Sequence, residues 1–160
     1  MQIISIDPGY DRVGVAILEK SIGNKEQLVY SDCLVTSSKE NFTSRLKSIG
    51  LGIEEIIHKY KPTALAIESL FFNSNQKTVM LVSEAKGMIK YVALKNNLDI
   101  FEYTPLQIKI AVTGYGRSSK QQITTMTKNL ISINKTIQYD DEYDAIAVGL
   151  TYFACNPIKS

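Results

Sequence analysis

Short apolar segments alternate with longer segments of helical periodicity along this 160-residue chain. A strand is expected where apolar and polar residues alternate, or where a short apolar run stands between turn residues. The continuous run TALAI, for example, is typical of a central strand that is buried on both faces. The expected strands cover residues 1–7, 13–18, 27–36, 63–67 and 99–103.

Apolar residues that recur every three or four positions predict helices between and after these strands. The expected helices cover residues 41–60, 75–96, a short segment through Lys109, 118–131 and 141–153. Three successive strands followed by helix–strand alternation predict an α/β fold, a mixed five-stranded sheet flanked by helices. No repeat or linker is visible, so residues 1–160 are expected to form a single domain.

Composition and cysteine content predict a folded protein of a reducing compartment. Hydrophobic residues make up 44% of the chain and charged residues 21%, close to the average of globular proteins. Cys33 and Cys155 have no Cys or His partner at metal-ligand spacing, and the first residues lack the features of a signal peptide. Since no apolar stretch approaches the length of a membrane span, we expect a cytoplasmic protein without a membrane partner.

Basic residues are concentrated in the middle of the chain. Residues 69–139 contain nine Lys or Arg and three acidic residues, whereas residues 1–68 have a net charge of −1 and residues 140–160 of −3. Between Tyr103 and Tyr139 there are five basic residues and no acidic residue. This distribution fits an ordinary solvated face as well as a surface that binds phosphate groups.

Acidic residues stand at the ends of two expected strands and at the start of the last expected helix. Asp7 and Glu68 each directly follow an apolar strand, so parallel pairing would bring both carboxylates to one sheet edge. Asp144 shares a helical face with Asp141 and Asp140 and could act with either. Each acid also has a plainer interpretation: Asp7 as a turn former, Glu68 as an exposed loop acid, and Asp140 or Asp141 as a helix N-cap.

Acids gathered at one sheet edge would repel one another unless cations were present. All-oxygen ligands suit magnesium or manganese, and the sequence therefore predicts Mg²⁺ as cofactor, with Mn²⁺ as a second candidate. A cluster of this kind can hold two ions about 4 Å apart, one activating water and the other stabilising the leaving oxygen in phosphodiester hydrolysis.

Four sequence segments add specific information because of their order and spacing. They are IDPG followed by VGVA, then ESLFFNSNQKTVMLVSEAKG, YTPLQIKIAVTGYGRSSKQQ and DEYDAIAVG. IDPG alone is a weak signal, whereas the second and third segments are specific. Over nearly its whole length the chain resembles the RuvC family of Holliday-junction resolvases, which belongs to the ribonuclease-H-like nuclease superfamily. The resemblance implies a ribonuclease-H-like sheet.

The same resemblance implies roles for individual residues. Its Asp-x-x-Asp spacing selects Asp141 over Asp140, and the implied metal-binding catalytic acids are Asp7, Glu68, Asp141 and Asp144. Lys109 and Lys120 match basic residues near the scissile phosphate and are counted with the catalytic set. Phe71 matches an aromatic residue that stacks on bases at the junction centre. The expected DNA-binding residues are Phe71, Phe72, Lys77, Lys109, Arg117 and Lys120.

These observations together predict a metal-dependent endonuclease that cuts two strands of a four-way DNA junction. A two-fold substrate favours a homodimer with one active site per strand, and the expected helix 75–96 has apolar residues on more than one stripe. A branch-migration helicase is a further candidate partner. Two alternatives stay open: an RNA-processing nuclease of the same superfamily, and a branched-DNA-binding protein without catalytic activity.

Overall fold

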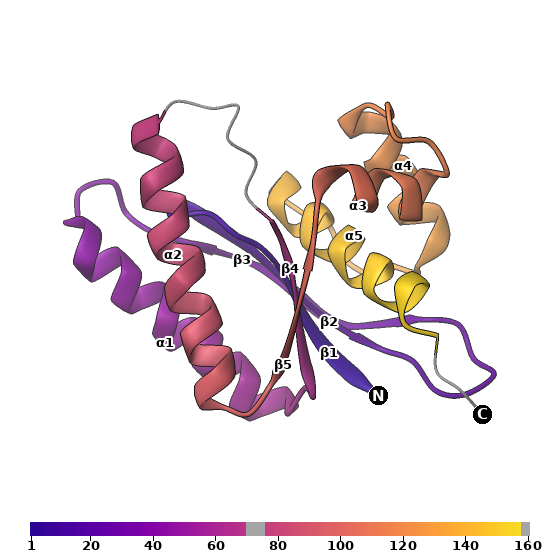
Figure 1. Ribbon diagram of the computed structural model, residues 1–160, viewed down its shortest axis with the longest axis horizontal. Coiled ribbons are helices and arrows are strands. Elements are labelled where there is room, and N and C mark those ends of the chain that lie inside the picture. Colours follow the sequence, from indigo (N-terminus) through magenta and orange to yellow (C-terminus); the bar gives the residue numbers. More distant parts are fainter. Residues whose placement is uncertain (70–75, 158–160) are drawn as a thin grey trace.

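The computed structural model describes residues 1–69 and 76–157 and contains one five-stranded sheet of order β3-β2-β1-β4-β5 (Figure 1). β1 pairs with β2, and β2 with β3, in antiparallel fashion, whereas β1–β4 and β4–β5 are parallel pairs. The prediction of a mixed five-stranded sheet is therefore confirmed. The strand bounds are β1 Gln2–Asp7, β2 Arg12–Glu19, β3 Gln27–Val35, β4 Ala64–Glu68 and β5 Asp99–Tyr103.

Helices cover both faces of the sheet. In Figure 1, α1 and α2 lie on one face and α3, α4 and α5 on the other, in agreement with the two separate hydrophobic cores. The expected helices agree with the observed ones to within about two residues at their ends. The helix bounds are α1 Phe42–Tyr60, α2 Gln76–Lys95, α3 Pro105–Thr113, α4 Lys120–Leu130 and α5 Asp140–Cys155.

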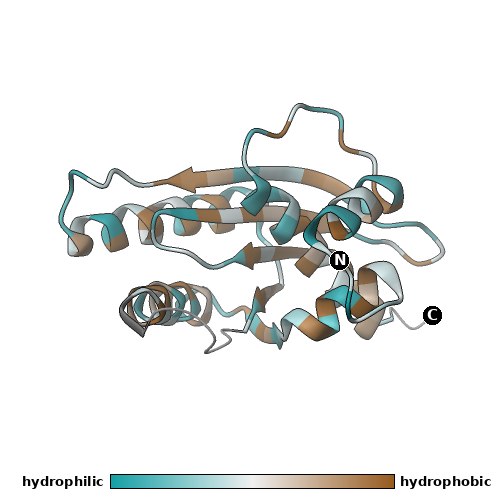
Figure 2. Cartoon of the chain, turned by 90° about the horizontal axis from the view of Figure 1, so that it is seen from above, coloured by the Kyte–Doolittle hydropathy of each residue, from teal (hydrophilic) through white to brown (hydrophobic). Residues whose placement is uncertain are grey.

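The alternation of side chains along the strands decides which core each strand residue joins. Ile3 of β1 packs in the core beneath α5, whereas Ile4 and Ile6 pack in the core beneath α1 and α2. The central strands β1, β2 and β4 are buried over nearly their whole length, as a sheet covered on both faces requires, and Figure 2 shows hydrophobic and hydrophilic residues alternating along the helices. Because successive residues of a strand point to opposite faces, Asp7 shares the face of Ile3 and therefore lies on the side of α5.

Two glycines let α5 lie directly against the sheet. A Cβ atom added to Gly14 of β2 would stand 1.8 Å from the carbonyl oxygen of Asp141. A Cβ atom added to Gly149 of α5 would stand 2.6 Å from Cδ1 of Leu18. The helix is also anchored by burial, since every residue from Ala145 to Phe153 is buried. The first turn of α5 is thus held against the end of β2.

None of the helices in residues 1–69 and 76–157 is both long enough and apolar enough to cross a membrane.

Replacing Gly14 by Ala should destabilise the protein and displace the first turn of α5, because the added methyl group meets backbone atoms of Asp141. We expect the free energy of unfolding to fall by roughly 1–3 kcal/mol, the usual cost of overpacking. Urea unfolding measures this change. Gly149→Ala is the matched control and should destabilise the protein less than Gly14→Ala. Its methyl group meets side-chain atoms of Leu18 and Ser5, which can shift, and not backbone atoms. Equal stability of wild type and Gly14→Ala would contradict the expected displacement.

Candidate active site

Asp7 and Glu68 lie side by side at the end of the sheet. In the parallel pairing of β1 with β4, Ile6 stands opposite Ile67, so the next residue of each strand brings the two acids together. Glu68 shares the sheet face of Ala64 and Ala66, which pack in the core beneath α5. Both carboxylates are therefore carried on the face that α5 covers.

The first turns of α5 bring two further acids to this edge. Asp141 and Asp144 are three residues apart, so they lie on one side of the helix. The contact of the Asp141 backbone with Gly14 fixes this turn beside β1 and β2, because Gly14 pairs with Asp7. The structure thus brings the four acids expected from the sequence to one edge of the sheet.

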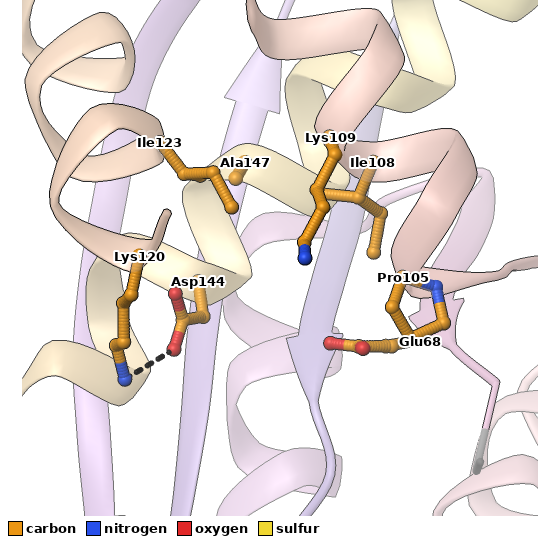
Figure 3. Close-up of a pocket in the computed structure, with 8 residues that line it drawn as sticks. All are labelled: Glu68, Pro105, Ile108, Lys109, Lys120, Ile123, Asp144 and Ala147. Atoms are coloured by element: carbon orange, nitrogen blue, oxygen red, sulfur yellow. Dashed lines mark ion pairs between the residues drawn. The ribbon is translucent and has the colours of Figure 1, made fainter. Parts of the chain in front are cut away.

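A pocket of about 220 Å³ opens beside these acids (Figure 3). Glu68, Lys109 and Asp144 project into it from β4, α3 and α5, and Lys120 lies at its side. Thr104 and Ser119 begin α3 and α4 with capping boxes, which fix the helix starts that carry the two lysines. The pocket is lined by Glu68, Pro105, Ile108, Lys109, Lys120, Ile123, Asp144 and Ala147.

Burial and mutual repulsion dominate the electrostatics of the acids. Burial raises the pKa of Asp7 well above its usual value, and the charges of Glu68, Asp144 and Asp141 raise it further. Burial, followed by the charge of Asp144, raises the pKa of Glu68 to about 7. The pKa of Asp144 is also raised by burial, although Lys120 opposes this effect. The four acids therefore form one electrostatic cluster whose negative charge is only partly compensated.

Among the described residues, Lys120 and Arg12 form ion pairs with acids of the α5 start and partly compensate for this charge. Nζ of Lys120 lies 3.0 Å from Oδ2 of Asp144 and 3.7 Å from Oδ2 of Asp140. Burial lowers the pKa of Lys120, but its contact with Asp144 outweighs this effect and the pKa is raised overall. Nε of Arg12 lies 3.1 Å from Oδ2 of Asp141. Lys120 was expected from the sequence, whereas Arg12 was not.

The donor chemistry of the cluster fits a divalent cation. Carboxylate oxygens are the ligands that Mg²⁺ and Mn²⁺ prefer, and Oδ2 of Asp141 is buried without a hydrogen-bond partner in the described part of the chain. The described residues contain no group of three or more His, Cys, Asp or Glu side chains arranged around a single ion position. An open site does not require one, because Mg²⁺ commonly takes one or two carboxylates and completes its shell with water and substrate phosphate.

The start of α5 differs from the sequence-based interpretation in two details. The N-cap residue is Tyr139, without a side-chain cap hydrogen bond, so Asp140 is the first helical residue and not the cap. Glu142, for which the sequence pattern indicated no role, is buried and forms an ion pair with Lys135. Lys135 also donates a hydrogen bond to the carbonyl oxygen of Ser31, 2.6 Å away. Lys135 thus connects the segment before α5 to β3, and this long-range contact could not be predicted from a local sequence pattern.

Arg117 is the only other expected DNA-binding residue whose side chain the structure describes. Phe71 and Phe72 lie outside the described residues, and the description does not extend to the side chain of Lys77. Arg117 is exposed in the turn between α3 and α4 and does not line the pocket. The structure therefore brings together the four acids, Lys109 and Lys120, while the roles of the remaining residues stay predictions.

The fold and site together define the class of protein. A mixed sheet of this order, with acids at the ends of β1 and β4 and on the helix that crosses them, is the ribonuclease-H-like arrangement expected from the sequence. The sequence profile described as "Crossover junction endodeoxyribonuclease RuvC" matches residues 3–152. The chain belongs to this family.

Individual relatives agree with this assignment. The chain is 43% identical over 152 residues to the crossover junction endodeoxyribonuclease RuvC of Natranaerobius thermophilus, covering 95% of this chain and 94% of the relative. It is 42% identical to that of Halothermothrix orenii, covering 95% and 92%.

Two solved structures from Thermus thermophilus share the fold, each at 26% sequence identity. One is RuvC, with a TM-score of 0.85 and coverage of 96% of this chain and 94% of that structure. The other is RuvC in complex with a Holliday junction substrate, with a TM-score of 0.87 and coverage of 94% and 92%. The ribonuclease-H-like fold predicted from the sequence is thereby confirmed.

The raised pKa values predict that the metal-free protein loses stability as the pH rises. The pKa of Glu68 is about 7 in the folded protein, against an ordinary value of 4.5. Between these values the folded state binds more protons than the unfolded state, so the free energy of unfolding should fall with increasing pH. Urea unfolding in chelator between pH 4.5 and 8 measures this slope.

Glu68→Gln should flatten the slope, and Glu55→Gln, an exposed position on α1, should leave it unchanged. Added Mg²⁺ should oppose the loss above pH 7, since the ion requires deprotonated ligands. An identical slope in wild type and Glu68→Gln would show that Glu68 does not titrate in this range.

Proposed function

We propose that this protein is a structure-selective endonuclease that resolves four-way DNA junctions by paired, metal-dependent phosphodiester hydrolysis. The observation that carries the proposal is the acidic cluster beside Lys109 and Lys120, at the sheet edge of a chain that belongs to the RuvC family. The relative from Thermus thermophilus is described in complex with a Holliday junction substrate, and it aligns with 94% of this chain.

In this proposal the four acids hold the cofactor and the lysines hold DNA. Asp7, Glu68, Asp141 and Asp144 would bind Mg²⁺, with Mn²⁺ as an alternative and two ions in each site. Bound ions would lower the pKa of water and neutralise charge on the leaving oxygen. Lys109 and Lys120, which reach the same pocket from α3 and α4, would bind phosphate oxygens beside the scissile bond. Lys120 would exchange its ion pair with Asp144 for a phosphate contact.

Further DNA contacts are proposed for four other residues. Phe71 would stack on bases at the junction centre, and Phe72, Lys77 and Arg117 would extend the contact surface. Lys109, Arg117 and Lys120, three of the five basic residues between Tyr103 and Tyr139, support a DNA-binding face around the site.

We place the interface of a proposed homodimer on α2, on the face of the sheet opposite to the active site. Met80, Tyr91 and Leu94 of α2 are 66%, 66% and 60% exposed, which is unusual for large apolar side chains on one helix. Together with Glu84 and Gly87, these three residues form one stripe along the helix. Successive members of the stripe are four or three residues apart in alternation, which is the spacing found where two helices pair. A Cβ atom added to Gly87 would meet nothing within 4 Å, so a partner helix could approach closely there.

Dimerisation through α2 would leave both active sites accessible, since α2 and α5 cover opposite faces of the sheet (Figure 1). A branch-migration helicase as a further partner and a cytoplasmic location remain predictions from the sequence.

The same observations weigh against one of the two alternatives. A branched-DNA binder without activity has no need for buried acids that raise one another's pKa, because such a cluster is costly unless cations compensate for it. An RNA-processing nuclease could use the same acids. The two kinds of enzyme can therefore be distinguished only by which substrate the protein cuts.

Asp144→Asn should abolish junction cleavage while junction binding survives, because the amide keeps the shape of the side chain but loses its charge. We expect at least about a hundredfold slower nicking, the usual loss when one electrostatic stabiliser is removed. The assay uses labelled four-way junction, linear duplex and RNA hairpin, with Mg²⁺, with Mn²⁺ and with chelator.

Asp140→Asn is the matched control, since Asp140 lies on the same helix and near the same lysine but is 71% exposed. It should cleave like wild type. Equal cutting of linear duplex, preference for the RNA hairpin, or cleavage in chelator would refute the proposed function.

Leu94→Glu should weaken the proposed dimer, because it would bury an unpaired carboxylate between two copies of α2. We expect the dimer dissociation constant to rise at least about tenfold, measured by analytical ultracentrifugation. The two nicks in one junction should then become uncoupled. Ile22→Glu is the matched control, since Ile22 is 64% exposed in the turn after β2. A dimer that is unaffected by Leu94→Glu would place the interface elsewhere.

A further inference from the structure

Arg12 stands at the first position of β2, at the rim of the acidic cluster. The turn before it is held by a second arginine, Arg45, whose Nη2 donates to the carbonyl oxygen of Tyr10 at 3.1 Å and which forms an ion pair with Asp11. The backbone N–H of Thr36 also donates to the carbonyl oxygen of Asp11, at 2.9 Å. The position from which the Arg12 side chain departs is therefore well fixed.

The Arg12 side chain lies along the first turn of α5. Its Nε is 3.1 Å from Oδ2 of Asp141, and its guanidinium carbon is 5.4 Å from the ring centroid of Tyr139, the N-cap residue of α5. The side chain is 49% exposed. Among the described residues, Nη1 and Nη2 have no ion-pair or hydrogen-bond partner, so most of the guanidinium donors are free.

The contact between Arg12 and Asp141 is loose. Oδ2 of Asp141 is within ion-pair distance of Arg12 but receives no hydrogen bond of acceptable geometry in the described part of the chain. An ion pair with one half-exposed partner contributes little net energy, because water competes for both charges. A divalent ion would attract the same carboxylate more strongly. The ion pair between Arg12 and Asp141 is therefore expected only while no divalent ion is bound.

We infer that Arg12 is a DNA phosphate-binding residue whose availability depends on whether Asp141 ligates metal. Without metal, Arg12 compensates for the charge of Asp141. When Asp141 serves as a ligand, Arg12 leaves it and, still supported by the ring of Tyr139, donates its N–H groups to a DNA phosphate beside the site. A guanidinium suits this task because its planar donors match phosphate oxygens in pairs. The inference rests on the proposed function and adds to it a link between metal and DNA.

Thermodynamic linkage makes this coupling reciprocal. If metal releases Arg12 for DNA, then metal strengthens DNA binding and DNA strengthens metal binding by the same factor. A merely structural Arg12, which only anchored the first turn of α5, would not link the two ligands. The two roles can therefore be separated by measuring one ligand in the presence and absence of the other.

The test measures binding of a four-way junction to wild type and Arg12→Gln over a range of salt concentrations, once with Ca²⁺ and once with chelator. With Ca²⁺, the variant should bind about tenfold more weakly, the usual effect of losing a hydrogen bond to a charged group. The slope of log affinity against log salt should fall by about one, which corresponds to one lost phosphate contact. In chelator, both quantities should match those of wild type.

A second measurement uses the protein without DNA. Arg12→Gln should bind Mn²⁺ about two- to fivefold more tightly than wild type in calorimetry, because the competing cation has been removed. Arg12→Lys should keep the salt slope of wild type, since it retains a positive charge. Lys25→Gln removes the same charge from the turn at the other end of β2 and should change neither measurement.

An equal loss of junction affinity in Ca²⁺ and in chelator, or no loss in Ca²⁺, would overturn the inference. Weaker Mn²⁺ binding together with a lower unfolding temperature would assign Arg12 a structural role and would also overturn it. These outcomes leave the proposed function untouched, because that function fails only if wild type does not prefer junctions or does not require metal to cut them.

Discussion

Repulsion among the carboxylates at one edge of the sheet is the constraint that explains the surrounding cations and the close packing of the scaffold. Burial and neighbouring negative charge raise the pKa values of Asp7, Glu68 and Asp144, so the cluster is unfavourable without cations. In the described part of the chain, Lys120 forms an ion pair with Asp144 and Arg12 with Asp141, and both cations are partly exposed. Partly exposed ion pairs contribute little energy, so a divalent cation can replace these two side chains at the acids.

The acids cannot relieve their repulsion by moving apart, because each is fixed by a different part of a close-packed scaffold. The register of β1 with β4 places Asp7 beside Glu68. Gly14 admits the backbone of Asp141 against β2, and the buried apolar part of α5 holds that helix on the sheet. Since interiors of this density shift little, the unfavourable charge is retained and can be used for binding ions.

The arrangement also separates the proposed tasks of the molecule. The pocket lies on the face of α3, α4 and α5, with Lys109 and Lys120 reaching it from two helices whose starts are capped. The exposed apolar stripe of α2 lies on the other face, where a second copy would not obstruct DNA. A two-fold substrate and a two-fold enzyme can then meet with both sites accessible.

Local patterns in the sequence were enough to predict the elements, because short apolar runs, helical spacing and the helix caps Thr104 and Ser119 are local properties. It also indicated the four acids, since strand ends and the first turn of a helix are visible in the pattern, although helix geometry alone left Asp140 and Asp141 equivalent. The contact of Arg12 with Asp141 and the burial of Glu142 against Lys135 became visible only in the folded chain. These partners are far apart or follow no periodic pattern, so their contacts depend on how α5 docks on the sheet. The same docking, through Gly14, converts acids that are scattered in the chain into a single charged cluster.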